Sequence, residues 1–310
     1  MMTIRQAFEQ FLQSLELTES ESAEAIRQHT FLREGLQEQL DVAQNFLSGS
    51  YARNTAIRPL NDIDVFLVLV PTATLNRSST PEEVLEAVRD ALEATYPGKA
   101  PTIQSRSVNI EFSGTGIAYD VVPAFLDPDD DEVYWIPDCD RPGWIKTNPR
   151  IHRELSVTAN EAAGKKLKPL VKAVKHANNL HGKSARSFHL EVLAWSILTS
   201  APEDYITGLE RLILGLREQI LKPCPDPAGL GPDIRPGPEK LQGARAWLDD
   251  MAKVTEAREA AANGRLGEAH GIMRELFGDR WPEKGEPRKG GRAGAVAIGG
   301  AVDDSRSRFG

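Results

Sequence analysis

Two aspartates separated by one residue stand at the head of an apolar run. Asp62 and Asp64 flank Ile63, and aliphatic or aromatic residues follow as far as Val70. Residues two apart in a β-strand project from the same face, so the two carboxylates would lie side by side. Neighbouring carboxylates repel one another unless a cation lies between them. The pair therefore predicts an oxygen-ligand site for a divalent ion such as Mg²⁺ or Mn²⁺.

A third acid lies on a later apolar segment. Asp120 occurs in the stretch Ala118–Val122, and its carboxylate joins the pair if this strand lies beside the first. The alternative is a solvent-facing charge at a strand end, but apolar neighbours make an unpaired charge costly there. Three carboxylates holding two metal ions about 3.5–4 Å apart catalyse in-line displacement at phosphorus. The sequence therefore predicts phosphoryl chemistry.

A small residue and a hydroxyl precede the aspartate pair by about a dozen positions. Gly49 lets the backbone approach a phosphate closely, and Ser50 offers a backbone N–H and a hydroxyl. An isolated Asp-x-Asp also occurs in surface turns and in sugar-nucleotide transferases. Its combination with Gly-Ser upstream and a later acid is specific for nucleotidyl transfer.

A lysine-rich segment further along the chain offers a seat for a triphosphate. Lys168, Lys172 and Lys175 share one helix face by their spacing, where like charges are destabilising unless an anion gathers them. A solvated basic face is the alternative. Downstream, Ser187 is predicted to be a helix N-cap, and Phe188 could stack on a base or pack as a core aromatic.

The elements that position these residues follow from hydrophobic periodicity. Helical spacing is found over residues 4–15 and 22–47, and Thr18 with Glu21 forms a capping box before the second helix. The next segments are predicted as a strand, a helix, a hairpin and an irregular crossing: 62–69, 81–95, 108–112 with 117–125, and 135–149. The later segments are helical: about 151–163, 165–180, 187–200, 203–220, 238–262 and 265–277.

These elements predict a bilobal α+β protein. Residues 1–150 form N-terminal helices and a catalytic core with a mixed sheet, and residues 151–285 form an all-α lobe. The tail, 286–310, holds too few large apolar groups to order itself.

The composition of the chain limits the classes of partner that are expected to bind it. The chain of 310 residues carries a formal net charge of −8, which argues against a dedicated nucleic-acid binder. Local lysines or metal ions can still hold a triphosphate. No apolar run is long enough to span a membrane and no signal peptide is seen, so a cytoplasmic location is expected.

The cysteines and histidines add little chemistry. Cys139 and Cys224 form neither a disulfide framework nor a zinc cluster. The histidines lack metal-ligand spacing, and no role in the chemistry is assigned to four of them: His152, His176, His181 and His189.

The chain resembles the polymerase-beta-like nucleotidyltransferases, and within them the cGAS/DncV-like group (CD-NTases) with its relatives the oligoadenylate synthetases. The resemblance covers about residues 45–200 and lies in Gly49-Ser50-x-x-Arg53, Asp62-x-Asp64, Asp120, Lys172-x-x-Lys175 and Ser187-Phe188-His189-Leu190-Glu191. It implies the fold of that family, a mixed sheet with helices followed by an all-α lobe.

The resemblance also implies roles. The three aspartates would bind two Mg²⁺ ions, with Mn²⁺ as an alternative. Nucleotide contacts would come from seven residues: Gly49, Ser50, Arg53, Lys172, Lys175, Ser187 and Phe188. Among them Ser50, Lys175 and Ser187 correspond to triphosphate contacts, and Phe188 to the ring against the donor base.

The segments Tyr134–Pro137 and Gly143–Pro149 are similar to bacterial members from antiphage (CBASS) operons. Those enzymes condense ATP and other ribonucleoside triphosphates into cyclic di- or trinucleotides with release of pyrophosphate. A linear nucleotidyltransferase acting on RNA, protein or a small molecule is the alternative, and a non-catalytic member would normally lack one of the acids. DNA sensing is not expected, because no zinc-binding insertion or strongly basic face is visible.

The resemblance extends to partners. An operon-encoded regulator is one candidate. The ending Arg308-Phe309-Gly310 is similar to synthases whose terminal residue is joined to other molecules by a ubiquitin-like conjugation partner, with a plain frayed end as the alternative.

Overall fold

A mixed β-sheet forms the centre of the N-terminal lobe in the computed structural model, which describes residues 2–141 and 143–283. Seven strands of these residues make one sheet, in which β2 and β5 run parallel and the other pairs are antiparallel. The main order is β1 (Val42–Leu47), β2 (Asp62–Leu69), β5 (Ile117–Leu126), β4 (Val108–Phe112) and β3 (Thr102–Ile103), and β6 (Tyr134–Asp138) and β7 (Gly143–Thr147) continue from β5.

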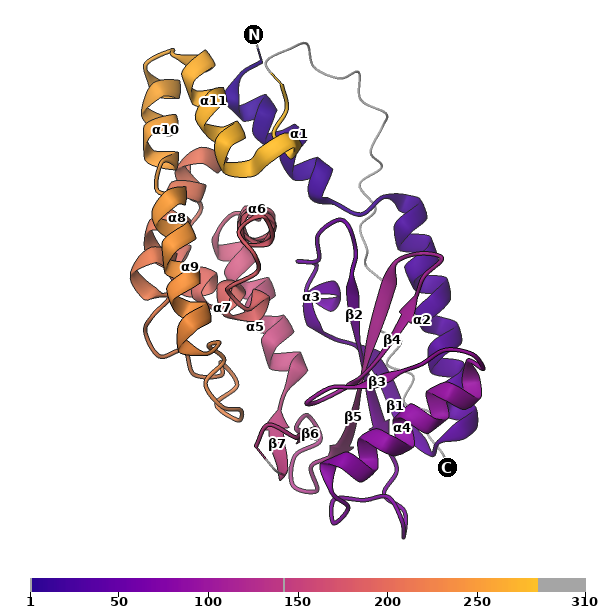
Figure 1. Ribbon diagram of the computed structural model, residues 1–310. Helices are drawn as coiled ribbons and strands as arrows, with labels where there is room; N and C mark the ends of the chain where they lie inside the picture. The colour runs from indigo at the N-terminus through magenta and orange to yellow at the C-terminus, as the bar shows by residue number, and fades with distance from the viewer. Residues whose placement is uncertain (1, 142, 284–310) are drawn as a thin grey trace.

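Strand β2 is buried on both faces. Ile63, Val65 and Leu67 pack into a hydrophobic cluster with α2 (Glu19–Gln39) and α4 (Pro81–Thr95), which cover one side of the sheet (Figure 1). Phe66 and Val68 pack on the other side, against β5 and β6. The aspartates at the start of β2 share this second side, which is the side turned towards the C-terminal helices.

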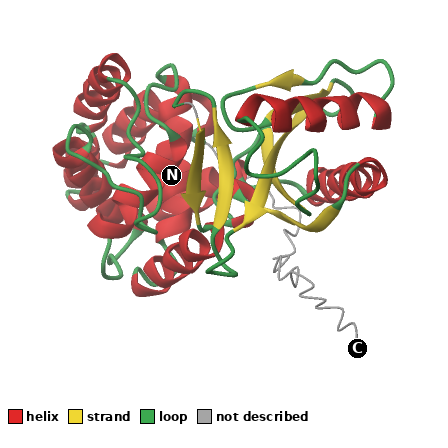
Figure 2. Ribbon diagram, turned by 90° about the horizontal axis from the view of Figure 1, so that it is seen from below, coloured by secondary structure: helices red, strands yellow, loops and turns green. Residues whose placement is uncertain are grey.

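The helical lobe lies across the sheet from α2 and α4, as Figure 2 shows with the sheet between two groups of helices. Its elements are α5 (Pro149–Ala162), α6 (Leu167–Leu180), α7 (Ser187–Ile197), α8 (Tyr205–Gln219), α9 (Pro238–Met251), α10 (Val254–Ala262), α11 (Leu266–Phe277) and the 3₁₀ turn Gly278–Arg280. The predicted bilobal α+β architecture is confirmed.

The N-terminal helix packs with the helical lobe. The rings of Phe8 and Phe11 in α1 (Ile4–Leu15) lie 5.0 and 5.6 Å from the ring of Trp281. These side chains belong to the same buried cluster as α6, α8 and α11. From α1 in the helical lobe, the chain therefore passes through the sheet lobe and returns to the helical lobe with α5. A domain boundary at residue 150 stays a proposal.

Most predicted elements are confirmed, including the capping box in which Glu21 N–H donates to Thr18 Oγ1. The helix predicted over 22–47 is wrong beyond residue 39, because 42–47 forms strand β1 on the edge of β2. The segment Val42–Leu47 is too short for its pattern to distinguish a helix from a strand, and the edge of β2 offers backbone partners that a helix end lacks.

Two further predictions are corrected. The segment 135–149, predicted to be irregular, contains the hairpin β6–β7, in which Pro137 pairs with Trp144. Proline is tolerated there because Pro137 lies beyond the residues of β6 that pair with β5, so this part of β6 is an edge. The helix predicted over 238–262 is divided into α9 and α10.

None of the described helices has the length and hydrophobicity that a membrane span requires. The tail 286–310, with Gly310, lies outside the described residues.

Candidate active site

Parallel pairing of β2 with β5 brings the acidic residues together. Asp64 lies directly opposite Asp120, and Asp62 lies opposite Ala118 on the same side of the sheet. The pairing required for a three-carboxylate cluster is therefore present. Asp62 and Asp64 come from the start of β2 and Asp120 from β5, and the neighbouring strand β4 supplies Asn109, which bonds Asp120.

The environment of the cluster disfavours negative charge. The pKa of Asp64 is raised to about 6, chiefly by burial and then by the charges of Asp120 and Asp62, while the cations Arg53 and Lys175 lower it. Burial also raises the pKa of Asp120, against a hydrogen bond of 2.8 Å that Asn109 Nδ2 donates to its Oδ1. Carboxylates crowded in this way gain stability from a nearby cation.

The donor set fits a hard divalent cation. Asp62, Asp64 and Asp120 offer oxygen atoms only, as Mg²⁺ and Mn²⁺ prefer. Among residues 2–141 and 143–283, no three His, Cys, Asp or Glu side chains form a ready-made metal group. These three carboxylates would have to adjust their positions to hold an ion, and the metal assignment remains a proposal.

The Asp64 carboxylate lies against the short helix α3 (Gly49–Ala52). Gly49 has φ +61°, and a Cβ at this position would lie 1.6 Å from Asp64 Oδ2. The Ser48 N–H donates to the Asp64 carbonyl at 2.9 Å. Glycine is therefore required first by the close approach of α3 to β2, and the phosphate approach predicted from sequence remains a further proposed use of it.

We predict that Gly49→Ala lowers nucleotidyl transfer by about 10²-fold, because the methyl group must displace Asp64 by an ångström or more. Gly98→Ala is a matched control, since Gly98 has φ +89° and a methyl group at this position would have no neighbouring atom within 4 Å. Initial rates of pyrophosphate release measure both. Equal losses in the two variants would show that backbone strain alone is responsible.

The two lobes meet at a buried group of charges. Glu191 on α7 is 0% exposed; its Oε2 accepts a hydrogen bond of 2.8 Å from Arg53 Nε, which follows α3. Its Oε1 lies 3.4 Å from Lys175 Nζ on α6, which also donates to the Thr55 carbonyl at 2.8 Å. Burial alone would raise the pKa of Glu191, but Arg53 and Lys175 outweigh it and bring this pKa to about 2.

The lysine face predicted to hold a triphosphate is arranged differently from the sequence prediction. Lys172 is buried and its Nζ lies 2.6 Å from Glu16 Oε2, just beyond α1. With Lys175 paired to Glu191, carboxylates gather the charges of both lysines, so a solvated basic face is excluded for them. Lys168 is half-buried, and burial followed by the charge of Lys172 lowers its pKa.

The start of α7 differs by one residue from the prediction. Arg186 occupies the N-cap position without a side-chain hydrogen bond, and Ser187 is the exposed first residue of the helix. Phe188 is half-buried, and its ring lies 4.7 Å from the Arg53 guanidinium. Phe188 therefore stands at the lobe junction with part of its ring accessible.

Sequence reasoning missed Glu191 as an organising residue. Its signal was a single acid surrounded by Leu190, Val192 and Leu193 on an apolar helix, which predicts a buried charge with a partner. The partners could not be identified because Arg53 is 138 residues away in the sequence.

We predict that Glu191→Gln lowers the free energy of unfolding by about 3–5 kcal/mol, because two buried cations lose their shared partner. Glu9→Gln is the matched control, since Glu9 pairs with Arg5 on an exposed helix face and contributes under about 1 kcal/mol. Urea denaturation measures both. A loss from Glu191→Gln as small as that of the control would contradict the assigned role.

The pKa of Asp64 gives a pH dependence. Between its ordinary value of 3.8 and about 6, the folded protein keeps a proton that the unfolded chain releases, so stability falls as pH rises through this window. Above it the charge costs the metal-free protein about 1–3 kcal/mol.

Asp64→Asn is therefore expected to be more stable than the wild type at pH 7.5 in EDTA, with the difference vanishing near pH 4. Urea denaturation at both pH values measures it. A difference that persists at pH 4 would assign the gain to packing and not to charge.

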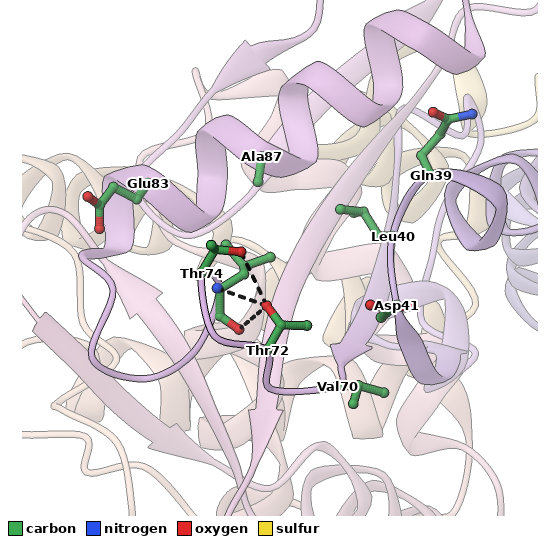
Figure 3. A pocket seen from close by; sticks show the side chains of 9 residues that line it. Gln39, Leu40, Asp41, Val70, Thr72, Thr74, Glu83 and Ala87 are labelled. Carbon is green, nitrogen blue, oxygen red and sulfur yellow. Dashed lines mark hydrogen bonds between the residues drawn. The ribbon is translucent and has the colours of Figure 1, made fainter.

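A cavity of about 480 Å³ lies away from this site (Figure 3). It is lined by Gln39, Leu40, Asp41, Val70, Thr72, Thr74, Leu75, Glu83 and Ala87. Val70 follows the last residue of β2, whereas Asp62 is its first, so the cavity and the carboxylates lie at opposite ends of the strand.

The fold and the carboxylate cluster define a nucleotidyltransferase. Residues 2–160 match the Second Messenger Oligonucleotide or Dinucleotide Synthetase (SMODS) domain. The cyclic AMP-AMP-AMP synthase of Acinetobacter sp. (strain ATCC 27244 / 9458) is 31% identical over 307 residues, covering 91% of this chain and 86% of that protein. The chain belongs to the SMODS family, the CD-NTases of bacterial CBASS signalling.

Solved structures share the fold. E. coli MS115-1 CdnC with ATP has a TM-score of 0.72 at 18% identity, covering 90% of this chain and 99% of that chain. Vibrio cholerae DncV, a cyclic AMP-GMP synthase, has a TM-score of 0.70 at 16% identity, covering 91% and 97%. Enzymes of this class generally depend on divalent cations, which agrees with the oxygen donors found here.

Proposed function

We propose that this enzyme condenses ribonucleoside triphosphates, ATP among them, into a cyclic di- or trinucleotide with Mg²⁺ as cofactor. The observation that supports it best is the register of Asp64 against Asp120 beside Gly49 and Ser50, in a chain that shares its family with a cyclic AMP-AMP-AMP synthase. E. coli CdnC has been solved with ATP. A cytoplasmic location, where these nucleotides are made, is part of the proposal.

In each step a ribose hydroxyl oxygen attacks the α-phosphorus of a triphosphate, forming one P–O bond while the bond to pyrophosphate breaks. Asp62 and Asp64 would hold the two Mg²⁺ ions, which supply charge neutralisation at the phosphates. Asp120, whose pKa burial raises, would help to accept the hydroxyl proton. Asn109 fixes the orientation of the Asp120 carboxylate by its hydrogen bond.

The donor nucleotide is proposed to lie between α3 and the start of α7. Ser50 on α3 and Ser187 on α7 would contact the triphosphate, and Phe188 the base. Arg53, Lys172 and Lys175 supply positive potential while they stay paired with carboxylates. Direct contact of either lysine with phosphate would require it to exchange its partner.

A regulator is part of the proposal. E. coli MS115-1 CdnC has been solved in complex with a HORMA protein, and we infer that a protein of this kind acts on the present enzyme. Conjugation of Gly310 to a ubiquitin-like partner remains a separate expectation, tested by deleting Gly310 and following conjugates in cells.

Product analysis tests the proposal. The purified protein is incubated with the four ribonucleoside triphosphates and Mg²⁺, and the products are treated with phosphatase and identified by mass spectrometry. We expect a phosphatase-resistant, adenosine-containing ring. The variant Asp62→Asn/Asp64→Asn should lose more than about 10³-fold in rate while keeping its fold.

Two results would contradict the proposal in different ways. A linear, phosphatase-sensitive product alone would favour the runner-up, a linear nucleotidyltransferase acting on RNA, protein or a small molecule. Product formation by the double variant would instead overturn the assignment of the carboxylates.

A further inference from the structure

A buried histidine–aspartate pair lies beside the lobe junction. His152 Nε2 on α5 is 2.6 Å from Asp226 Oδ1, in the segment between α8 and α9, and the two residues are 8% and 7% exposed. Neither residue belongs to the proposed nucleotide or metal contacts. The pair joins segments that are 74 residues apart in the sequence, so it fixes the connection after α8 against α5.

The aspartate is firmly held. Its Oδ2 accepts hydrogen bonds from the N–H groups of Gly231 and Leu230 at 2.8 and 3.2 Å. Burial alone would raise the pKa of Asp226, but the hydrogen bonds from His152 and Gly231 outweigh it and bring this pKa to about 2. Asp226 is therefore a fixed anionic acceptor that sets the orientation of the His152 ring.

The oriented imidazole lies against Phe188. The ring centroids of His152 and Phe188 are 4.9 Å apart with an angle of 57° between their planes. The Phe188 ring also lies 4.7 Å from the Arg53 guanidinium and 6.1 Å from the Trp195 ring. Three groups from three different elements therefore restrain a ring that is only half-buried.

Restraint of this kind matters for stacking. Rotation about the last side-chain torsion of phenylalanine is soft, so a partly exposed ring samples a broad range of orientations unless its neighbours hold it. A base stacks well only on a ring whose face is presented at a defined angle. Arg53, which follows α3, contacts Phe188 and also binds Glu191 on the same helix as Phe188. The position of the Phe188 ring is therefore linked to α3, which packs against Asp64.

We propose that Asp226 and His152 are positioning residues that hold Phe188 as the stacking surface for the nucleobase of the donor triphosphate. The inference rests on the proposed function, in which Phe188 contacts that base. Asp226 orients the imidazole, and the imidazole holds the phenyl ring. Neither residue touches the reacting phosphate, so the pair acts on nucleotide binding and not on the chemical step.

The test compares His152→Leu with His176→Leu. Both histidines are 8% exposed, and the His176 ring bonds the Phe277 carbonyl at 3.0 Å and lies 5.7 Å from the Phe11 ring. Binding of a non-hydrolysable ATP analogue with Mg²⁺ is measured by calorimetry, together with KM, kcat and Tm. We expect His152→Leu to raise Kd and KM by about 5- to 30-fold with kcat within about 3-fold. His176→Leu should leave Kd unchanged.

A double-variant cycle separates positioning from general loosening. In the Phe188→Leu background, the further change His152→Leu should leave Kd unchanged, because the ring it positions is gone. An independent additional loss, or an unchanged Kd in folded His152→Leu alone, overturns the inference. If His152→Leu does not fold, Asp226→Asn, which keeps the side-chain shape, is held to the same outcomes.

Measurements of nucleotide binding and of turnover distinguish failure of the positioning inference from failure of the proposed function. If the wild type binds the analogue through Phe188 but forms no oligonucleotide, the proposed synthesis is wrong while the positioning inference is still decided by Kd. If Phe188→Leu itself leaves Kd unchanged, the positioning inference is overturned whatever the enzyme makes.

Discussion

The structure depends on one buried carboxylate shared by two cations from different lobes. Glu191 on α7 pairs with Lys175 on α6 and with Arg53 from the catalytic lobe, so α3 and the helical lobe are joined at a buried charged centre. An uncompensated ion in this place would be costly, so all three side chains must stay in register. That requirement fixes the distance between the carboxylates on the sheet and the aromatic ring at the start of α7.

Close backbone packing links this charged centre to the carboxylate cluster on the sheet. Because Gly49 leaves room for the Asp64 carboxylate, α3 lies directly on β2. In the parallel partner β5, Asp120 lies directly opposite Asp64. The site therefore stores like charges in a partly buried position, which raises the pKa of Asp64. Membership of the SMODS family agrees with the proposal that divalent cations bind at this cluster.

Local patterns predicted much of the site, and non-local contacts accounted for what was missed. Alternation along β2 put Asp62 and Asp64 on one face, because the strand period is fixed by the backbone. The partners of Lys172 could not be predicted in this way, since Glu16 lies 156 residues from it. The segment of strand β1 was wrongly predicted as helix, because its conformation depends on hydrogen bonding to the edge of β2.

The path of the chain through the two lobes has a mechanical consequence. Since α1 packs among the C-terminal helices, the backbone crosses between the lobes twice, once after Leu15 and once before Pro149. Two bodies joined by two connecting segments turn most easily about the line through both crossings, and other rotations must stretch a segment. The two connections therefore define the axis about which the lobes of this enzyme rotate most easily, and Glu191 holds the lobes together at their junction.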